Sequence, residues 1–169
     1  MSFELLHFRE SDKVLKKLKM MQDVVKTLEY LDTVLYEAPN KGELLKQALK
    51  DMGWREEKTL NILENRRYQH KGVKNKVALD GYIGTFENLE GIFRLQLSFD
   101  KQKIQTGIVL MNSLRSFDSP FGSSQELIEW EISQLEPTIF MPISVALFDL
   151  GKTDSEPAEP PLEESMPKQ

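Results

Sequence analysis

The sequence predicts an α/β fold with a mixed central β-sheet and helices on both faces. A long amphipathic segment lies near the N-terminus, and strand-like and helix-like segments alternate after Trp54, an order typical of α/β layers. Residues 107–111 form an apolar run of the kind found in strands that are buried on both faces. Because 169 residues normally make one domain, we expect a single domain over residues 1–150.

The N-terminal segment is expected to be one long helix over residues 11–36, capped by Ser11. Its apolar residues recur at spacings of three and four, which produces one apolar stripe. The stripe consists of Val14, Leu18, Met21, Val25, Leu28, Leu31 and Leu35. A second helix is predicted over residues 43–52, with Gly53 at its C′ position and Trp54 packed beneath the pair.

The rest of the chain is expected to supply the sheet. Strands are predicted over residues 59–63, 77–83, 104–111 and 138–150. A turn at residues 72–75 is expected to join the second of these strands to a preceding one through Tyr68. A capping box at residues 123–126 predicts a helix that runs to about Leu135 and is ended by Pro137.

Residues 91–99 fit two different structures. Their apolar and polar side chains alternate strictly, which favours a strand. The apolar residues Phe86, Leu89, Phe93 and Leu97 also fit the spacing of a helix, which would run over residues 87–101, so periodicity alone leaves both open. We favour the helix, because strands and helices then alternate along the chain.

Composition excludes several kinds of chemistry. The chain has no cysteine, so disulfides, thiolate catalysis and cysteine-based zinc sites are not available. His7 and His70 are too few for a multi-histidine metal site. No stretch approaches the roughly 18 apolar residues of a membrane span, and the N-terminus lacks the order of a signal peptide. We therefore expect a cytoplasmic protein with no membrane partner.

The net charge of −5 is distributed unevenly. Residues 151–169 hold five acids, two lysines and four prolines, which leaves a net charge of only −2 for the other residues. This acidic, proline-rich tail has too few large apolar residues to offset its ordering entropy, so we expect it to be disordered. The charge of the remaining chain does not by itself indicate a nucleic-acid binder.

A family resemblance is carried by the order and spacing of several segments. These segments are residues 50–54, 76–80, 93–99, 103–110 and 142–148. Together they resemble the BglII-like type II restriction endonucleases of the PD-(D/E)xK nuclease superfamily, over residues 54–150. The resemblance implies a restriction-endonuclease-like sheet and favours the helix over residues 87–101. It also implies double-stranded DNA as a partner, a homodimer, and Mg²⁺ as the cofactor of an active enzyme.

The chemistry of that family requires two carboxylates, and usually a lysine or glutamine, around the metal. The resemblance places Asp80 at the strand acid, which makes it the metal ligand, and Tyr82 at the catalytic position two residues later, where the family has Gln, Glu or Lys. The first acid should lie upstream, but residues 69–72 contain none. In another register Asp80 is the first acid, Arg94 replaces the second, and Gln96 matches. Either register leaves one carboxylate, so we expect a degraded metal site.

Five basic residues lie close together in the segment 64–76, and we expect them to contact DNA phosphates. They are Arg66, Arg67, Lys71, Lys74 and Lys76. The same segment also fits a solvated polar hairpin whose lysines protect a sheet edge. His70 is expected to be an ordinary surface histidine. Glu64, Glu87 or Glu90 could supply a missing ligand from a neighbouring element.

These observations predict a restriction-endonuclease-like protein that is associated with DNA and has little or no nuclease activity. An active Mg²⁺-dependent endonuclease is one alternative. The other alternative is a non-enzymatic protein-interaction module on the same fold. The basic segment distinguishes this module from a DNA binder, in which the segment should form one positive face with Asp80.

Overall fold

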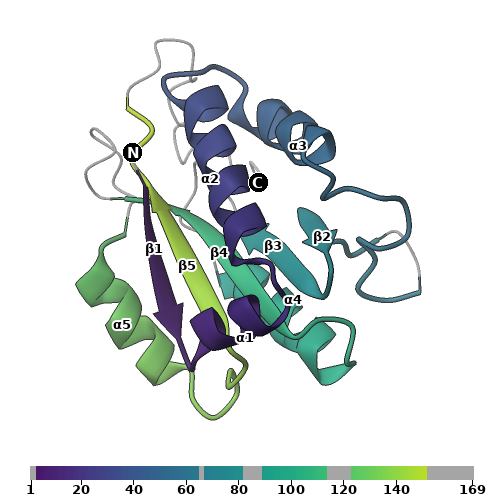
Figure 1. Cartoon of the computed structure of the whole chain (residues 1–169). Helices are drawn as coiled ribbons and strands as arrows, with labels where there is room; N and C mark the ends of the chain where they lie inside the picture. The colour runs from purple at the N-terminus through teal and green to yellow at the C-terminus, as the bar shows by residue number, and fades with distance from the viewer. Residues whose placement is uncertain (1–2, 65–66, 82–88, 114–122, 152–169) are drawn as a thin grey trace, which may run out of the picture.

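The computed structural model describes residues 3–64, 67–81, 89–113 and 123–151, and its centre is a five-stranded mixed sheet (Figure 1). The strand order is β1-β5-β4-β3-β2. The three inner strands, β5 (Ile143–Phe148), β4 (Thr106–Asn112) and β3 (Val77–Gly81), are parallel. The two edge strands, β1 (Phe3–Phe8) and β2 (Gly72–Lys74), pair antiparallel with their neighbours. The predicted mixed α/β sheet is confirmed.

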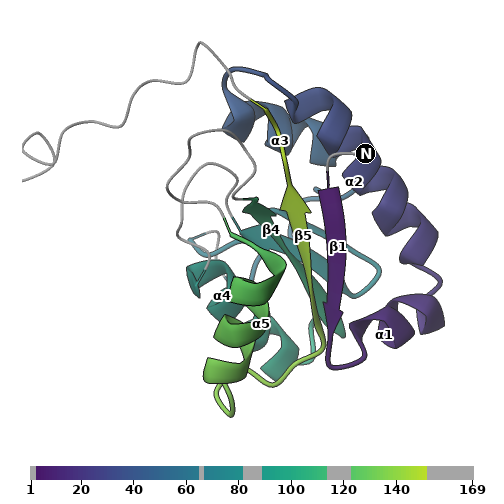
Figure 2. The same ribbon diagram turned by 90° about the vertical axis from the view of Figure 1, so that its left-hand side faces the viewer.

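Helices cover both faces of this sheet (Figures 1 and 2). One face is covered by α1 (Ser11–Lys17), α2 (Met21–Leu35) and α3 (Lys41–Asp51), and the other by α4 (Leu89–Asp100) and α5 (Gln125–Gln134). Among the described residues, no helix is long and apolar enough to cross a membrane.

Two hydrophobic cores result from the alternation of side chains along the strands. In β4, Ile108 and Leu110 pack with α1, α2 and α3, whereas Val109 and Met111 pack with α4 and α5. The predicted burial of Trp54 is confirmed, because its side chain is fully buried and its Nε1 donates a hydrogen bond of 2.8 Å to Thr27 Oγ1 on α2.

The prediction of one long N-terminal helix is wrong, because α1 ends at Lys17 and α2 begins at Met21. Lys19 has a φ of 58°, and Met20 N donates to Leu15 O at 2.9 Å. These features define a Schellman motif, in which buried Leu15 and Met20 make the apolar contact. Glycine normally occupies the left-handed position, so a lysine there left no signal in the sequence.

Other boundaries also differ from the prediction. Residues 59–63 do not form a strand, since only an isolated bridge joins Asn61 to Gln69. The last strand is shorter than the predicted 138–150, and β1 was not predicted. Ser124 rather than Ser123 caps α5. The helix at residues 87–101 is confirmed as α4, within the described residues.

Candidate functional site

Asp80 lies at the carboxyl ends of the parallel strands, where open α/β sheets usually bind ligands. It is the fourth residue of β3, and its side chain is fully buried beneath α4. Two glycines allow this close packing. A Cβ on Gly81, which has a φ of 98°, would lie 2.6 Å from Leu110 O, and a Cβ on Gly91 of α4 would lie 2.8 Å from Gly81 N.

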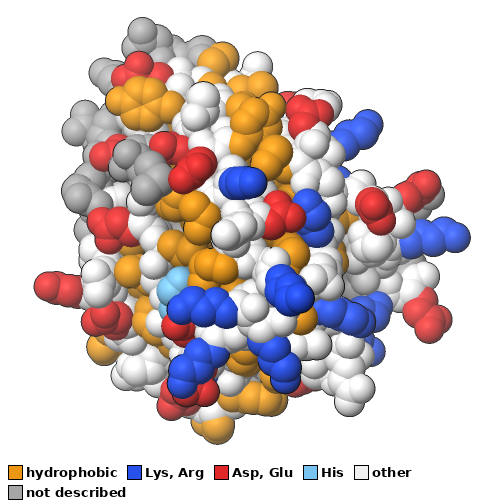
Figure 3. Space-filling view, viewed as in Figure 1, with side chains coloured by type: hydrophobic (Ala, Val, Ile, Leu, Met, Phe, Trp, Pro, Cys, Tyr) orange, Lys and Arg blue, Asp and Glu red, His pale blue; other side chains and the backbone are white. Residues whose placement is uncertain are grey.

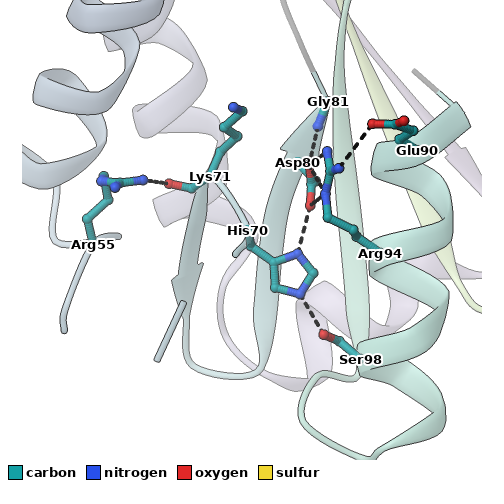
Figure 4. Close-up of polar contacts among 8 residues, drawn as sticks. All are labelled: Arg55, His70, Lys71, Asp80, Gly81, Glu90, Arg94 and Ser98. Atoms are coloured by element: carbon teal, nitrogen blue, oxygen red, sulfur yellow. Dashed lines mark hydrogen bonds and ion pairs between the residues drawn. The ribbon is translucent and has the colours of Figure 1, made fainter. Parts of the chain in front are cut away.

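The carboxylate of Asp80 is surrounded by hydrogen-bond donors (Figure 4). Arg94 Nη2 donates to Oδ1 at 2.7 Å, and Arg94 Nε lies 3.2 Å from Oδ1 and 3.1 Å from Oδ2. The Gly81 amide donates to Oδ1 at 2.8 Å, and His70 Nδ1 lies 2.8 Å from Oδ2. Both oxygens therefore have close nitrogen partners.

His70 joins Asp80 to the inner face of α4, so the prediction of a surface histidine is wrong. It is only 3% exposed, and its Nε2 lies 2.6 Å from Ser98 Oγ. The order Ser98, His70, Asp80 has the connectivity of a serine-protease triad. Because Ser98 is 1% exposed beneath the helix, its hydroxyl is placed to orient His70 and not to meet a substrate.

The electrostatics of the pair favour an ionised carboxylate. Burial would raise the pKa of Asp80, but hydrogen bonds from His70 and Arg94 and the positive charge of Arg94 outweigh burial, so this pKa is lowered. The pKa of Arg94 is raised, chiefly by its hydrogen bond to Asp80. The two groups therefore form an ion pair at neutral pH, in which the carboxylate is fully buried and the guanidinium is partly exposed.

Further cations lie around this pair. Lys71 is half-buried, and burial lowers its pKa; Asp80 opposes this effect, whereas Arg94, Lys46 and Arg55 add to it. Arg55 Nη1 also donates to Lys71 O at 2.6 Å. Lys71 thus lies among three other basic side chains and interacts electrostatically with the Asp80 carboxylate.

The residues described here do not fit a Mg²⁺ site. Mg²⁺ binds oxygen ligands and keeps several of its waters, whereas both oxygens of Asp80 are held by nitrogen donors and face a guanidinium. No group of three or more His, Cys, Asp or Glu side chains that could hold a metal occurs among the described residues. Glu90 is exposed and lies 3.7 Å from Arg94 Nη1, so it contacts the cation and not Asp80.

The alternative alignment with the family, in which Asp80 is the first acid and Gln96 matches, is not supported by the geometry of Gln96. Its Oε1 accepts hydrogen bonds from the Phe140 and Met141 amides, and its Nε2 donates to Asp100. Gln96 thus serves α4 packing, and only Arg94 of that register reaches Asp80. Tyr82 and Glu87 lie outside the described residues.

The structure separates the basic residues that the sequence grouped together. Lys71 lies at the Asp80 end of β3, and Lys74 and Lys76 lie at the opposite end. Arg67 is exposed and stacks its guanidinium 5.7 Å from the Tyr68 ring centre, while Arg66 lies outside the described residues. The described basic residues therefore do not form a single face with Asp80.

Lys74 and Lys76 line a hollow of about 530 Å³ beside the β2–β3 turn, together with Lys58 and Lys103. Lys74 is paired with Asp23 at 2.7 Å and donates to Met52 O.

Asn75 in the turn donates to Leu18 O at 3.1 Å, which brings the turn against the end of α1. The exposed lysines in and just after α1 are Lys13, Lys16, Lys17 and Lys19. Figure 3 shows Lys and Arg side chains gathered over the lower half of this face. We call the exposed lysines of α1, Lys19 and the β2–β3 turn the basic face.

Sequence reasoning did not find the roles of Ser98 and Gly91. Their only signal was the helical spacing that puts residues 91, 94 and 98 on one face of α4, toward the end of β3.

Comparisons with known proteins agree with the fold. No protein-family model matches the chain, and no curated protein matches it. Among solved structures, the chain is similar to the restriction endonuclease BglII complexed with a DNA 16-mer. The TM-score is 0.62 and the sequence identity is 15%, and the match covers 88% of this chain and 76% of that chain. The chain is also similar to free BglII, with a TM-score of 0.57, 11% identity and coverage of 88% and 79%. The chain has a divergent BglII-like restriction-endonuclease fold.

Proposed function

We propose that this protein binds double-stranded DNA and has little or no Mg²⁺-dependent nuclease activity. The observation that carries the proposal is the guanidinium of Arg94 on the carboxylate of Asp80, at 2.7 Å. A guanidinium occupies the side of the carboxylate that a metal ion would need.

The neighbouring positions support the same conclusion. The resemblance expects an acid upstream of Asp80, in residues 69–72, and there His70 contacts Asp80 directly. Binding a divalent cation at Asp80 would require Arg94 to leave, and breaking a buried ion pair costs about 3–5 kcal/mol. An ion that binds through one carboxylate cannot offset that cost against its own hydration. Mg²⁺ is therefore not part of the proposed function.

The DNA partner is supported by the fold and by charge. The similar structure of BglII contains a DNA 16-mer. In this chain, the basic face and the cations around Lys71 lie at the two ends of β3. With about 3.3 Å per residue, four residues of strand separate Lys76 from Asp80 by roughly 13 Å. A duplex carries one phosphate per ~1.7 Å of axis, so a separation of this size is short compared with the length of a bound duplex. A cytoplasmic location is part of this proposal.

A titration of fluorescent duplex DNA at low and moderate salt tests the proposal. We expect binding that weakens steeply with salt, because each phosphate contact contributes a slope of about −0.9 in log–log form. Lys76→Gln should make this slope less steep by the contribution of about one phosphate contact. Lys71→Gln tests separately whether the cations at the Asp80 end of β3 contact DNA.

The main alternative is a protein-interaction module that does not bind DNA. The net charge of −5 favours it, and so do the pairing of Lys74 with Asp23 and the separation of Lys71 from Lys74 and Lys76, which leaves no single positive face with Asp80. Absence of binding at low salt would select this alternative. An active nuclease instead requires an acid from outside the described residues, such as Glu87, to displace Arg94.

A further inference from the structure

The hollow beside the β2–β3 turn is lined by residues from three parts of the chain. They come from the segment after α3, from the β2–β3 hairpin and from the connection between α4 and β4 (Figure 1). Its volume of about 530 Å³ lies within the range of small-molecule sites, which is roughly 300–1,000 Å³. We call it the lysine hollow, because it is lined by Lys58, Lys74, Lys76 and Lys103.

Hydrogen bonds hold the walls of the lysine hollow in place. Lys103 Nζ donates to Ile62 O at 2.7 Å, which joins the segment after α3 to the α4–β4 connection. The Gln105 amide donates to Lys76 O at 2.8 Å, so the same connection also holds the end of the β2–β3 turn. Because these contacts order the walls, a ligand would lose little free energy in arranging its own site.

The lining of the lysine hollow is basic, although the net charge of the chain is −5. Among the described residues, four lysines and one acid, Glu56, line it. Asp23 neutralises one of the four lysines, since its carboxylate pairs with Lys74 at 2.7 Å. Within the part of the chain that the structure describes, no ion pair neutralises the other three. A cleft lined by charges of one sign concentrates ligands of the opposite sign, so the lysine hollow is suited to an anion.

The kind of charge indicates the class of anion. Lysine ammonium groups are compact point charges that bind phosphate oxygens. Several of them around one hollow attract linked phosphate groups more strongly than a single phosphate, because the Coulomb energies of the pairs add. None of the described lining residues is aromatic, so the site offers no ring on which a base could stack. We infer that the lysine hollow binds a small molecule that carries two or more linked phosphate groups.

The lysine hollow is distinct from the site around Asp80. Lys76 immediately precedes β3 and Asp80 is its fourth residue, so the strand separates them by roughly 13 Å. Lys76 also belongs to the basic face, whereas Lys58 and Lys103 do not, so a change at Lys58 distinguishes the two surfaces. The inference goes beyond the proposed function and does not depend on DNA binding.

Calorimetric titration of the full chain with inorganic tripolyphosphate tests the inference, with orthophosphate at the same ionic strength as the comparison. We expect tripolyphosphate to bind with a dissociation constant in the micromolar range, about 10-fold or more below that of orthophosphate. Lys58→Gln should raise the dissociation constant of tripolyphosphate about 10-fold, because it removes one charge from the hollow, and should leave the circular dichroism spectrum unchanged. Lys16→Gln is the matched control. It removes one exposed lysine of α1 outside the hollow, and should change this constant less than about two-fold.

Duplex DNA separates this inference from the proposed function. Lys58→Gln should leave the duplex affinity unchanged, since Lys58 lies outside the basic face. Tripolyphosphate binding without duplex binding would support the inference and contradict the proposed function.

Three results would overturn the inference. One is the absence of tripolyphosphate binding at about 1 mM ligand. Another is an equal loss of affinity in Lys58→Gln and Lys16→Gln, which would show only a general attraction between the protein and polyanions. The third is a parallel loss of duplex and tripolyphosphate binding in Lys58→Gln, because the hollow would then be part of a DNA surface.

Discussion

Replacing Arg94 by methionine removes the cation from Asp80 while it keeps much of the aliphatic side chain. The carboxylate is fully buried and would retain only His70 and the Gly81 amide as partners. Breaking a buried pair in this way costs about 3–5 kcal/mol, because it leaves an uncompensated charge. For a domain of 150–250 residues, 1 kcal/mol changes the thermal midpoint by about 2–4 °C. We therefore expect a decrease of roughly 6–20 °C at pH 7.

The pH dependence identifies the cause of this destabilisation. In the native protein the pKa of Asp80 is lowered, so its ionised form stabilises the fold above the unfolded pKa of about 3.9, and this contribution is lost as pH falls through the folded pKa. In Arg94→Met the carboxylate loses its cation and burial raises its pKa. The difference in stability between the two proteins should therefore shrink as the pH is lowered.

A double-mutant cycle measured by urea unfolding provides the control. Asp80→Asn combined with Arg94→Met leaves no buried charge, so the double variant should be more stable than Arg94→Met alone. An unfolding free energy of Arg94→Met within 1 kcal/mol of that of the native protein at pH 7 would show that the ion pair does not stabilise the fold. Strict additivity of the two substitutions would show the same.

Three further predictions concern the fold. Trp54→Phe removes the hydrogen bond to Thr27 and should lower the unfolding free energy by about 1–3 kcal/mol, measured by urea denaturation. Gly81→Ala should destabilise more than this in the same assay, since its Cβ would clash with the Leu110 carbonyl. Truncation after Gly151 should leave the thermal midpoint within roughly 2 °C by calorimetry, because the composition of residues 152–169 predicts disorder; a decrease of about 10 °C would show that the tail packs on the domain.

The elements that could be predicted from the sequence are those in which burial determines the order of apolar and polar residues. The buried run in β4 and the α4 helix are of this kind, since periodicity reports which side chains face a core. The break between α1 and α2 was missed, because Lys19 adopts a left-handed conformation without glycine. β1 was missed because its residues are mostly half-buried at a sheet edge, and its sequence does not alternate.

The site was only partly predictable for a related reason. Asp80 and the replacement of an acid by Arg94 were visible, because the family resemblance directs attention to carboxylates. The burial of His70 was not, since its partners lie 10 and 28 residues away in the sequence. Lys71 and Lys76 lie at opposite ends of β3, and no local sequence pattern indicates this separation.

Incubating the purified protein with supercoiled plasmid shows whether it binds DNA without metal-dependent hydrolysis. The incubation is done in EDTA, in Mg²⁺ and in Mn²⁺, and duplex binding is measured in the same three buffers. We expect duplex binding of similar strength in EDTA and in Mg²⁺ at matched ionic strength, and an intact plasmid in all three buffers. Metal-dependent cutting that is lost in Asp80→Ala would contradict this expectation, because Asp80 would then be a metal ligand completed by an acid from elsewhere in the chain.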